Sequence, residues 1–245
     1  DRLRQKINEH IGEQPLTAES AAILRAVTVA DGSGIEPKLW FLFQQFGLSH
    51  LLVVSGTHVT MVAAAGFILG AVCLRLLAPL SSRLRWLPGA AAILSACFYG
   101  ALAGLTLPVQ RALCMLFCFV LAGLVGRRSG AANSLLLAAS VVLVLTPLAA
   151  VGSGFWLSFG AVGALVWCAL WQRGLGGGMR LLQTQAAMSL FMLPLGALFF
   201  GGGSVIAMLA NLLMIPLLGW VVVPLALLAA VCFLGGWDVA AVLWQ

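Results

Sequence analysis

Apolar residues dominate the chain from residue 51 onward, with few polar interruptions. A helix that crosses a bilayer needs about 20 apolar residues, and backbone hydrogen bonds cannot be left open in lipid. The pattern therefore predicts an all-α polytopic membrane protein, a bundle of about six to eight transmembrane helices. Residues 205–234, interrupted by prolines, predict either a further pair of spans or a broken re-entrant pair. The other predicted spans are 51–74, 88–105, 108–126, 131–149, 154–172 and 181–200.

Residues 1–50 have a different pattern, in which polar and apolar positions recur with a helical period. Leu3, Ile7 and Ile11 recur every four residues and predict a short amphipathic helix. Thr17 is a typical N-cap for a second helix, and Pro37 suits the first turn of a third. The third helix carries an aromatic face, which is typical either of a helix in the membrane interface or of the core of a small extramembrane cap. That face consists of Leu39, Trp40, Phe43 and Phe46.

Composition excludes several classes of protein. Charged residues make up 8% of the chain, hydrophobic residues 62%, and the mean hydropathy is +1.09. This leaves too little polar surface for a soluble globular domain, a disordered tail or a secreted disulfide scaffold. The six cysteines lie in apolar runs without paired spacing, so we expect buried thiols and neither a metal site nor a cofactor. Because the chain lacks an initiator methionine and stops inside an apolar stretch, we expect it to be a fragment of a longer protein.

The arginines predict the orientation of the spans. They follow the first, third and fifth predicted spans, whereas the loops near residues 106, 147 and 201 carry no basic residue. By the positive-inside rule the arginine loops are cytoplasmic, in a multi-pass membrane protein. Residues 1–50 then form interfacial helices on the outer face, and residues 51–245 form the transmembrane domain. The arginines interpreted as topology determinants are Arg83, Arg85, Arg127, Arg128, Arg173 and Arg180.

The membrane region lacks negative charge. No Asp or Glu occurs between Leu39 and Trp237, whereas eight of the 13 basic residues, all arginines, lie there. Carboxylate relays of proton pumps are therefore not expected, and a polyanion is tolerated better than a cation. Arg111 lies on the predicted outer side, three residues after Pro108, where a topology role is weak. It is a candidate for pore lining or phosphate contact, with interfacial anchoring as the alternative.

Polar residues within the apolar region are further candidates. Ser55 and His58, three residues apart, share a helix face and are compatible with a serine–histidine nucleophile pair. The membrane region has no acidic residue to orient the histidine, so a polar face toward a water-filled path, or hydrogen bonding between helices, is the favoured interpretation. The other candidates for a polar path are Tyr99, Ser158, Gln183 and Asn211.

Four ordered blocks of sequence are specific in combination. They are Gly47–Val59 (GLSHLLVVSGTHV), Pro108–Ala112 (PVQRA), Gly154–Val162 (GFWLSFGAV) and Asn211–Leu217 (NLLMIPL). With these blocks the chain resembles the competence domain of the ComEC family over most of residues 20–230. Position 57 is Thr where other members often have Leu.

The resemblance implies an inner-membrane channel that takes single-stranded DNA into naturally transformable bacteria. Family members typically carry an OB-like domain before this region, and many carry a metallo-β-lactamase-like nuclease domain after it. We therefore expect a transport component, not an enzyme. Its expected partners are single-stranded DNA, the lipid bilayer, a DNA receptor outside, an ATPase or single-strand-binding proteins inside, and possible further copies of itself. The alternatives are an intramembrane hydrolase that uses Ser55 and His58, and a small-molecule exporter.

Overall fold

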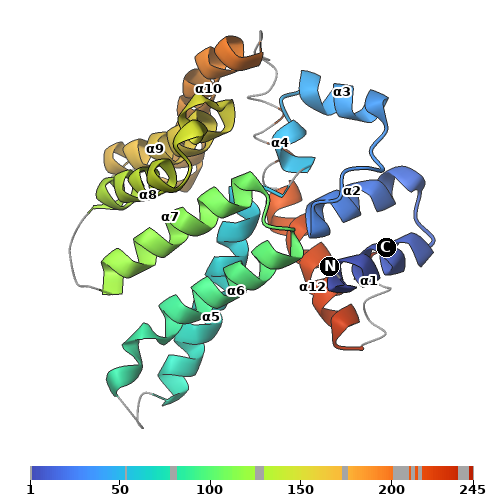
Figure 1. Ribbon diagram of the computed structural model, residues 1–245, viewed down its shortest axis with the longest axis horizontal. Coiled ribbons are helices and arrows are strands. Elements are labelled where there is room, and N and C mark those ends of the chain that lie inside the picture. Colours follow the sequence, from blue (N-terminus) through green and yellow to red (C-terminus); the bar gives the residue numbers. More distant parts are fainter. Residues whose placement is uncertain are drawn as a thin grey trace. The chain divides into compact units, whose positions relative to one another are not determined.

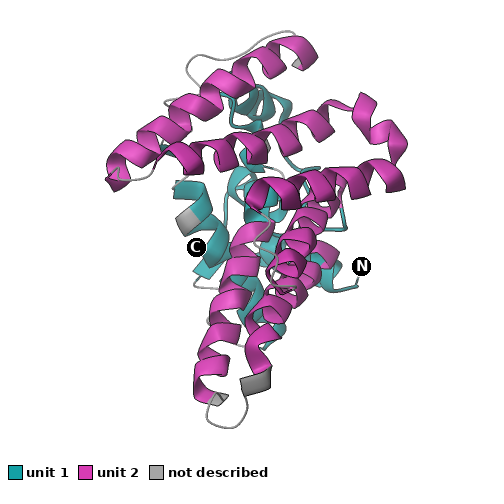
Figure 2. Ribbon diagram, turned by 90° about the vertical axis from the view of Figure 1, so that its left-hand side faces the viewer, with its two compact units in different colours: residues 1–58, 102–105, 203–245 teal, residues 59–101, 106–202 magenta. Residues whose placement is uncertain are grey.

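The computed structural model describes residues 2–52, 54–77, 82–124, 130–172, 176–200, 210, 213–214, 217–236 and 243–244. These residues form helices and turns and contain no strand, which confirms the all-α prediction. The chain divides into two compact units (Figure 2). Unit 1 comprises residues 1–58, 102–105 and 203–245, and unit 2 comprises residues 59–101 and 106–202.

Unit 1 joins the two ends of the chain. The face of the first helix that carries Ile7 and Ile11 is buried against Ala226 and Ala229 of the last. The ring of His10 stacks on Phe233 with centroids 4.0 Å apart. Placement of residues 1–50 on the outer face stays a prediction. The helices of the unit are α1 (Arg2–Glu13), α2 (Ala18–Val29), α3 (Pro37–Gln45), α4 (Ser49–Leu52), the π-helical turn η3 (Leu218–Val222) and α12 (Val223–Leu234) (Figure 1).

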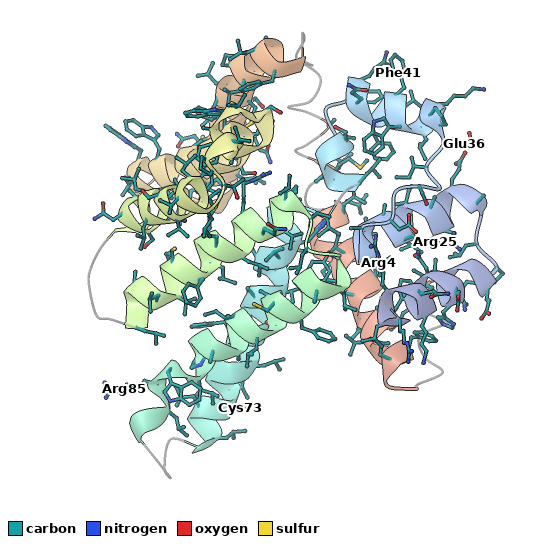
Figure 3. All side chains as sticks on the ribbon, viewed as in Figure 1. Arg4, Arg25, Glu36, Phe41, Cys73 and Arg85 are labelled. Atoms are coloured by element: carbon teal, nitrogen blue, oxygen red, sulfur yellow. The ribbon has the colours of Figure 1, made fainter. Side chains whose placement is uncertain are left out.

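The predicted helix starts in unit 1 are confirmed. Thr17 is the N-cap of α2, and its hydroxyl accepts a hydrogen bond from the Ser20 amide at 3.2 Å. Pro37 begins α3, where its missing N–H costs nothing. Helix α3 buries none of its residues, and Phe41, labelled in Figure 3, is 58% exposed.

Unit 2 contains most of the apolar helices. Its consecutive helices α7, α8 and α9 pack around Cys118, Ala138, Phe155 and Phe159. Its elements are α5 (Gly56–Leu77, whose first turn belongs to unit 1), η1 (Ser82–Trp86), α6 (Leu87–Leu102), α7 (Leu107–Leu124), α8 (Ala131–Leu145), η2 (Pro147–Val151), α9 (Ser153–Trp171) and α10 (Gly177–Phe200).

Four of the described helices are long and apolar enough to cross a membrane: α5, α7, α9 and α10. Helices α8 and α12 are apolar but shorter, and α6 has 16 residues. Each of the six separately predicted spans contains a helix, although several predicted boundaries were wrong. Residues 205–234 contain α12, with a π-helical turn before it, and residues 205–209, 211–212 and 215–216 of this region lie outside the described part.

The wrong boundaries have local causes. The first span does not begin at residue 51, because α4 ends at Leu52 and a separate helix starts at Gly56. Helix α6 stops at Leu102, short of the predicted 105, because Gly104 and Leu105 adopt positive φ angles of 72° and 50°. Helix α8 ends at Leu145, since Pro147 cannot continue it and instead starts η2.

Helices α5 and α6 form a closely packed pair (Figures 1 and 2). Gly66 and Gly70 form a GxxxG motif on α5 and face Ala91 and Ser95 of α6. The Ser95 hydroxyl donates to the Val62 carbonyl at 3.1 Å. Small residues thus allow the two backbones to approach.

Candidate functional site

Arg111 and Ser158 come together in unit 2, although 47 positions separate them in the sequence. Arg111 lies one turn into α7, and Ser158 lies in the second turn of α9. The Arg111 Nε donates a hydrogen bond to the Ser158 Oγ at 3.2 Å. Both side chains are half-buried. The structure thereby joins two residues that the sequence predicted separately.

Gly154 completes the surroundings of the guanidinium. A β-carbon built on Gly154 would lie 2.9 Å from Arg111 Nη2 and 3.5 Å from its Cζ. The guanidinium therefore occupies space that any side chain at position 154 would take. Gly154 and Ser158 are one turn apart on the same face of α9.

The charge of Arg111 has no carboxylate near it within its own unit. Unit 2 contains no Asp or Glu at all. Among the described residues, only Ser158 accepts a hydrogen bond from this guanidinium. Arginine carries five N–H donors in a planar fork that matches a phosphate or a carboxylate. The arrangement can therefore bind an anion.

Ser55 and His58 do not form a nucleophile pair in this structure. The Ser55 hydroxyl lies 2.5 Å from the Thr57 hydroxyl, and the Ser55 backbone N–H donates to His58 Nδ1 at 3.2 Å. Ser55 precedes α5, so His58 occupies its third position and reaches back to the N-cap amide. This is the geometry of a capping box, in which Glu or Gln usually plays that part. The SxxH spacing, which suggested catalysis, could have indicated this cap.

The remaining candidates are dispersed. Tyr99 lies in α6 and His58 in α5, and each is only 2% exposed. Gln183 is exposed on α10, whereas Gln185, about 200° around the same helix, is buried. Asn211 lies outside the described residues. A role in a DNA path stays a prediction for each of them.

The topology arginines are described only in part. The side chain of Arg85 is exposed in η1, next to the start of α6 (Figure 3), and Arg180 is exposed in the first turn of α10. The backbone of Arg83 lies in η1, and its side chain is not described. Arg127, Arg128 and Arg173 lie outside the described residues. The orientation they predict remains a prediction.

Neither an apolar cavity in unit 2 nor a group of metal-ligating side chains adds a second candidate site among the described residues. An apolar cavity of about 320 Å³ in unit 2 is lined by hydrophobic side chains such as Leu135, Phe159 and Phe191 together with Gly160. It offers no side-chain group for an anionic ligand. Within the described parts of the chain, no group of three His, Cys, Asp or Glu side chains is placed to hold a metal ion.

These features define a class: a multi-pass helical membrane protein with an arginine of uncompensated charge inside its helical unit. The sequence profile described as "Competence protein" matches residues 27–245 of the chain. The chain therefore belongs to the competence protein family. No solved structure matches it.

Curated relatives support the assignment. The chain is 37% identical over 218 residues to competence protein ComA of Neisseria gonorrhoeae, covering 87% of this chain and 31% of the relative. It is 26% identical over 243 residues to recombination protein 2 of Haemophilus influenzae, covering 93% and 30%. It is 28% identical over 213 residues to ComE operon protein 3 of Bacillus subtilis, covering 85% and 26%. The chain thus spans less than a third of the length of these relatives.

Proposed function

We propose that this chain is the membrane part of an inner-membrane channel that carries single-stranded DNA into the cytoplasm during natural transformation. Membership of the competence protein family supports a role in DNA uptake. The printed names of two relatives, a competence protein and a recombination protein, agree with such a role. The finer assignment to the ComEC type is part of the proposal.

The observation that carries the proposal is the electrostatics of unit 2. A DNA strand brings one negative charge per nucleotide, and carboxylates along its path would repel it. Unit 2 has none, and Arg111 is held there with one hydrogen bond, from its Nε to Ser158, among the described residues. The strand enters from the outer side and contacts Arg111 before it reaches the cytoplasmic arginines.

The chain acts in transport, and strand-degrading activity belongs to another domain or protein. A receptor presents DNA on the outer side. A partner ATPase, or capture by single-strand-binding proteins inside, supplies the direction, and more than one copy of the chain forms the pore. The rival hydrolase is disfavoured because the Ser55 hydroxyl is bonded to Thr57 and not to His58.

The test uses the full-length gene in its native host. Cells that lack the gene should take up no labelled DNA into the cytoplasm, and the intact gene should restore uptake. Arg111→Glu should reduce uptake to the level of the deletion strain, because a negative charge replaces the phosphate contact. The control is Arg85→Ala, since Arg85 is exposed in η1 and should tolerate the change. Normal uptake by Arg111→Glu, at equal protein levels in the membrane, would remove Arg111 from the path.

A further inference from the structure

We propose that Gly154 and Ser158 position Arg111 as a contact for a single phosphate group, and that Gly154 is a positioning residue for DNA recognition. This inference rests on the proposed function and adds to it the two residues of α9 that hold the arginine in place. Ser158 holds the Nε of the arginine, and Gly154 leaves the space in which the terminal nitrogens lie.

The contacts of Gly154 distinguish it from the packing glycines on the same helix. The three heavy atoms nearest to a β-carbon at position 154 all belong to Arg111. At Gly160 the same carbon would lie 2.6 Å from the Phe191 ring, which makes Gly160 a packing residue. At Gly163 the nearest atom is a Leu135 methyl at 3.7 Å, which is ordinary contact. Of these three glycines, only Gly154 is placed so that an added methyl group would displace the arginine.

A methyl group at position 154 should move Arg111 without disturbing the fold. The end of an arginine side chain is flexible, so it can move away from an added β-carbon. Alanine is also a better helix former than glycine, which favours α9 in the variant. The expected result of Gly154→Ala is therefore a folded protein whose guanidinium has left the position set by Ser158.

The geometry also explains why an arginine suits this place. With Nε bonded to Ser158, the two terminal nitrogens beside Gly154 still carry N–H donors, and a phosphodiester presents two oxygens that suit such a pair. A lysine could not hold the Ser158 contact and offer a fork at once. The ligand class is thus a phosphate group with two accessible oxygens.

The first experiment is a double-mutant cycle in full-length protein. Gly154→Ala should lower uptake of labelled DNA by about tenfold to a hundredfold, the range for loss of a hydrogen-bonded charge contact. Gly163→Ala, the matched control on α9, should keep wild-type uptake. In an Arg111→Ala background, Gly154→Ala should cause no further loss, since its effect passes through the arginine.

The second experiment measures the salt dependence of binding. Purified full-length protein in nanodiscs binds a fluorescent oligothymidylate at several salt concentrations. Loss of one phosphate contact lowers the slope of log affinity against log salt by about 0.7 for a single strand. Gly154→Ala and Arg111→Ala should each show this reduction, and Gly163→Ala should not. A purely structural role for Gly154 would leave the slope unchanged.

The outcomes separate the two proposals. Wild-type uptake in Arg111→Ala would remove the phosphate contact and, with it, both this inference and the central support for the channel. Loss of uptake in Arg111→Ala with normal uptake in Gly154→Ala would overturn this inference alone. An added loss in the Arg111→Ala background would show that Gly154 acts through packing and would also overturn it. If Gly154→Ala fails to accumulate in the membrane, Ser158→Ala decides, with an expected loss of about fivefold.

Discussion

The core of unit 1 and the α5–α6 pair of unit 2 are held together in opposite ways. In unit 1, large aliphatic side chains such as Ile7, Ile11 and Val29 fill the space between helices and are at most 1% exposed. In the α5–α6 pair, glycine at positions 66 and 70 removes side chains so that the backbones meet.

The difference reflects the environment that each helix surface leaves when it is buried. Helix α1 is polar apart from one apolar stripe, so burial of that stripe takes hydrocarbon away from polar surroundings. An apolar helix in a bilayer gains little from burying more hydrocarbon, because lipid tails are equally apolar. Close van der Waals contact is what remains, and small residues provide it. Alanine substitution should therefore weaken both regions, for opposite reasons.

The largest effect is expected from Ile11→Ala, which removes a side chain that is fully buried between α1, α2 and α12. Loss of transfer free energy and a residual cavity should destabilise unit 1 by about 2–5 kcal/mol. Amide exchange of residues 2–29 in full-length protein should accelerate about tenfold for each 1.4 kcal/mol lost. Leu3→Ala, at a position 44% exposed on the same helix, is the control and should change exchange little. Equal effects at both positions would mean that the cluster is not a core.

The second largest effect is expected from Gly70→Ala. This substitution adds one carbon to the α5–α6 contact, whereas Ile11→Ala removes three carbons from the core of unit 1. The new β-carbon would lie 2.8 Å from Pro88 Cα and 3.0 Å from the Leu87 carbonyl, backbone atoms that cannot turn aside. Overpacking should cost about 1–3 kcal/mol of unfolding free energy, measured by SDS titration of the purified protein. Gly123→Ala, where no atom lies within 4 Å, should be neutral or stabilising. The same sign at both glycines would contradict close packing of α5 on α6.

The same contrast explains which features the sequence could predict. The apolar stripe, the Thr17 cap and the Pro37 start are local signals, and the structure confirms the cap, the start and the burial of Ile7 and Ile11. Leu3, the first member of the predicted stripe, is 44% exposed. Long apolar runs likewise predicted helices. The burial of α1 against α12 could not be predicted from the sequence. Helix α12 is apolar all round, so its pattern does not show which face contacts another helix.

The candidate site was predictable only in pieces. Arg111 stood out as a charge without a topology role, and Ser158 as a polar residue in an apolar run. Their contact joins α7 to α9 across 47 positions of the sequence. Helical periodicity predicts neighbours within one helix and does not predict a contact between two helices. Gly154 gave no chemical signal, since its function is to lack a side chain. Its membership of the GFWLSFGAV block was the one available indication.

The smallest effect concerns a hydrogen-bonded carboxylate in unit 1, a group that the α5–α6 pair does not contain. Asn8 of α1 donates to the Asp31 carboxylate at 2.6 Å, and Arg4 donates to the Ala30 carbonyl at 3.3 Å. The hydroxyl and amide of Ser33, then Asn8, and less strongly Arg4, hold the pKa of Asp31 below its ordinary value. These bonds tie α1 to the end of α2 beside the aliphatic core.

The sign of the pH dependence follows from that lowered pKa. An aspartate ionises in an unfolded chain near a pKa of about 3.9, and in folded unit 1 at a lower pH. Its stabilisation is therefore complete above that unfolded value and is lost as the pH falls through the folded pKa. Amide exchange of residues 2–29, corrected for its intrinsic pH dependence, should accelerate below about pH 4 in wild-type protein. Asp31→Asn should flatten this dependence, whereas Glu13→Gln at an exposed position should keep it. An unchanged profile in Asp31→Asn would show that the aliphatic core alone holds α1 in place.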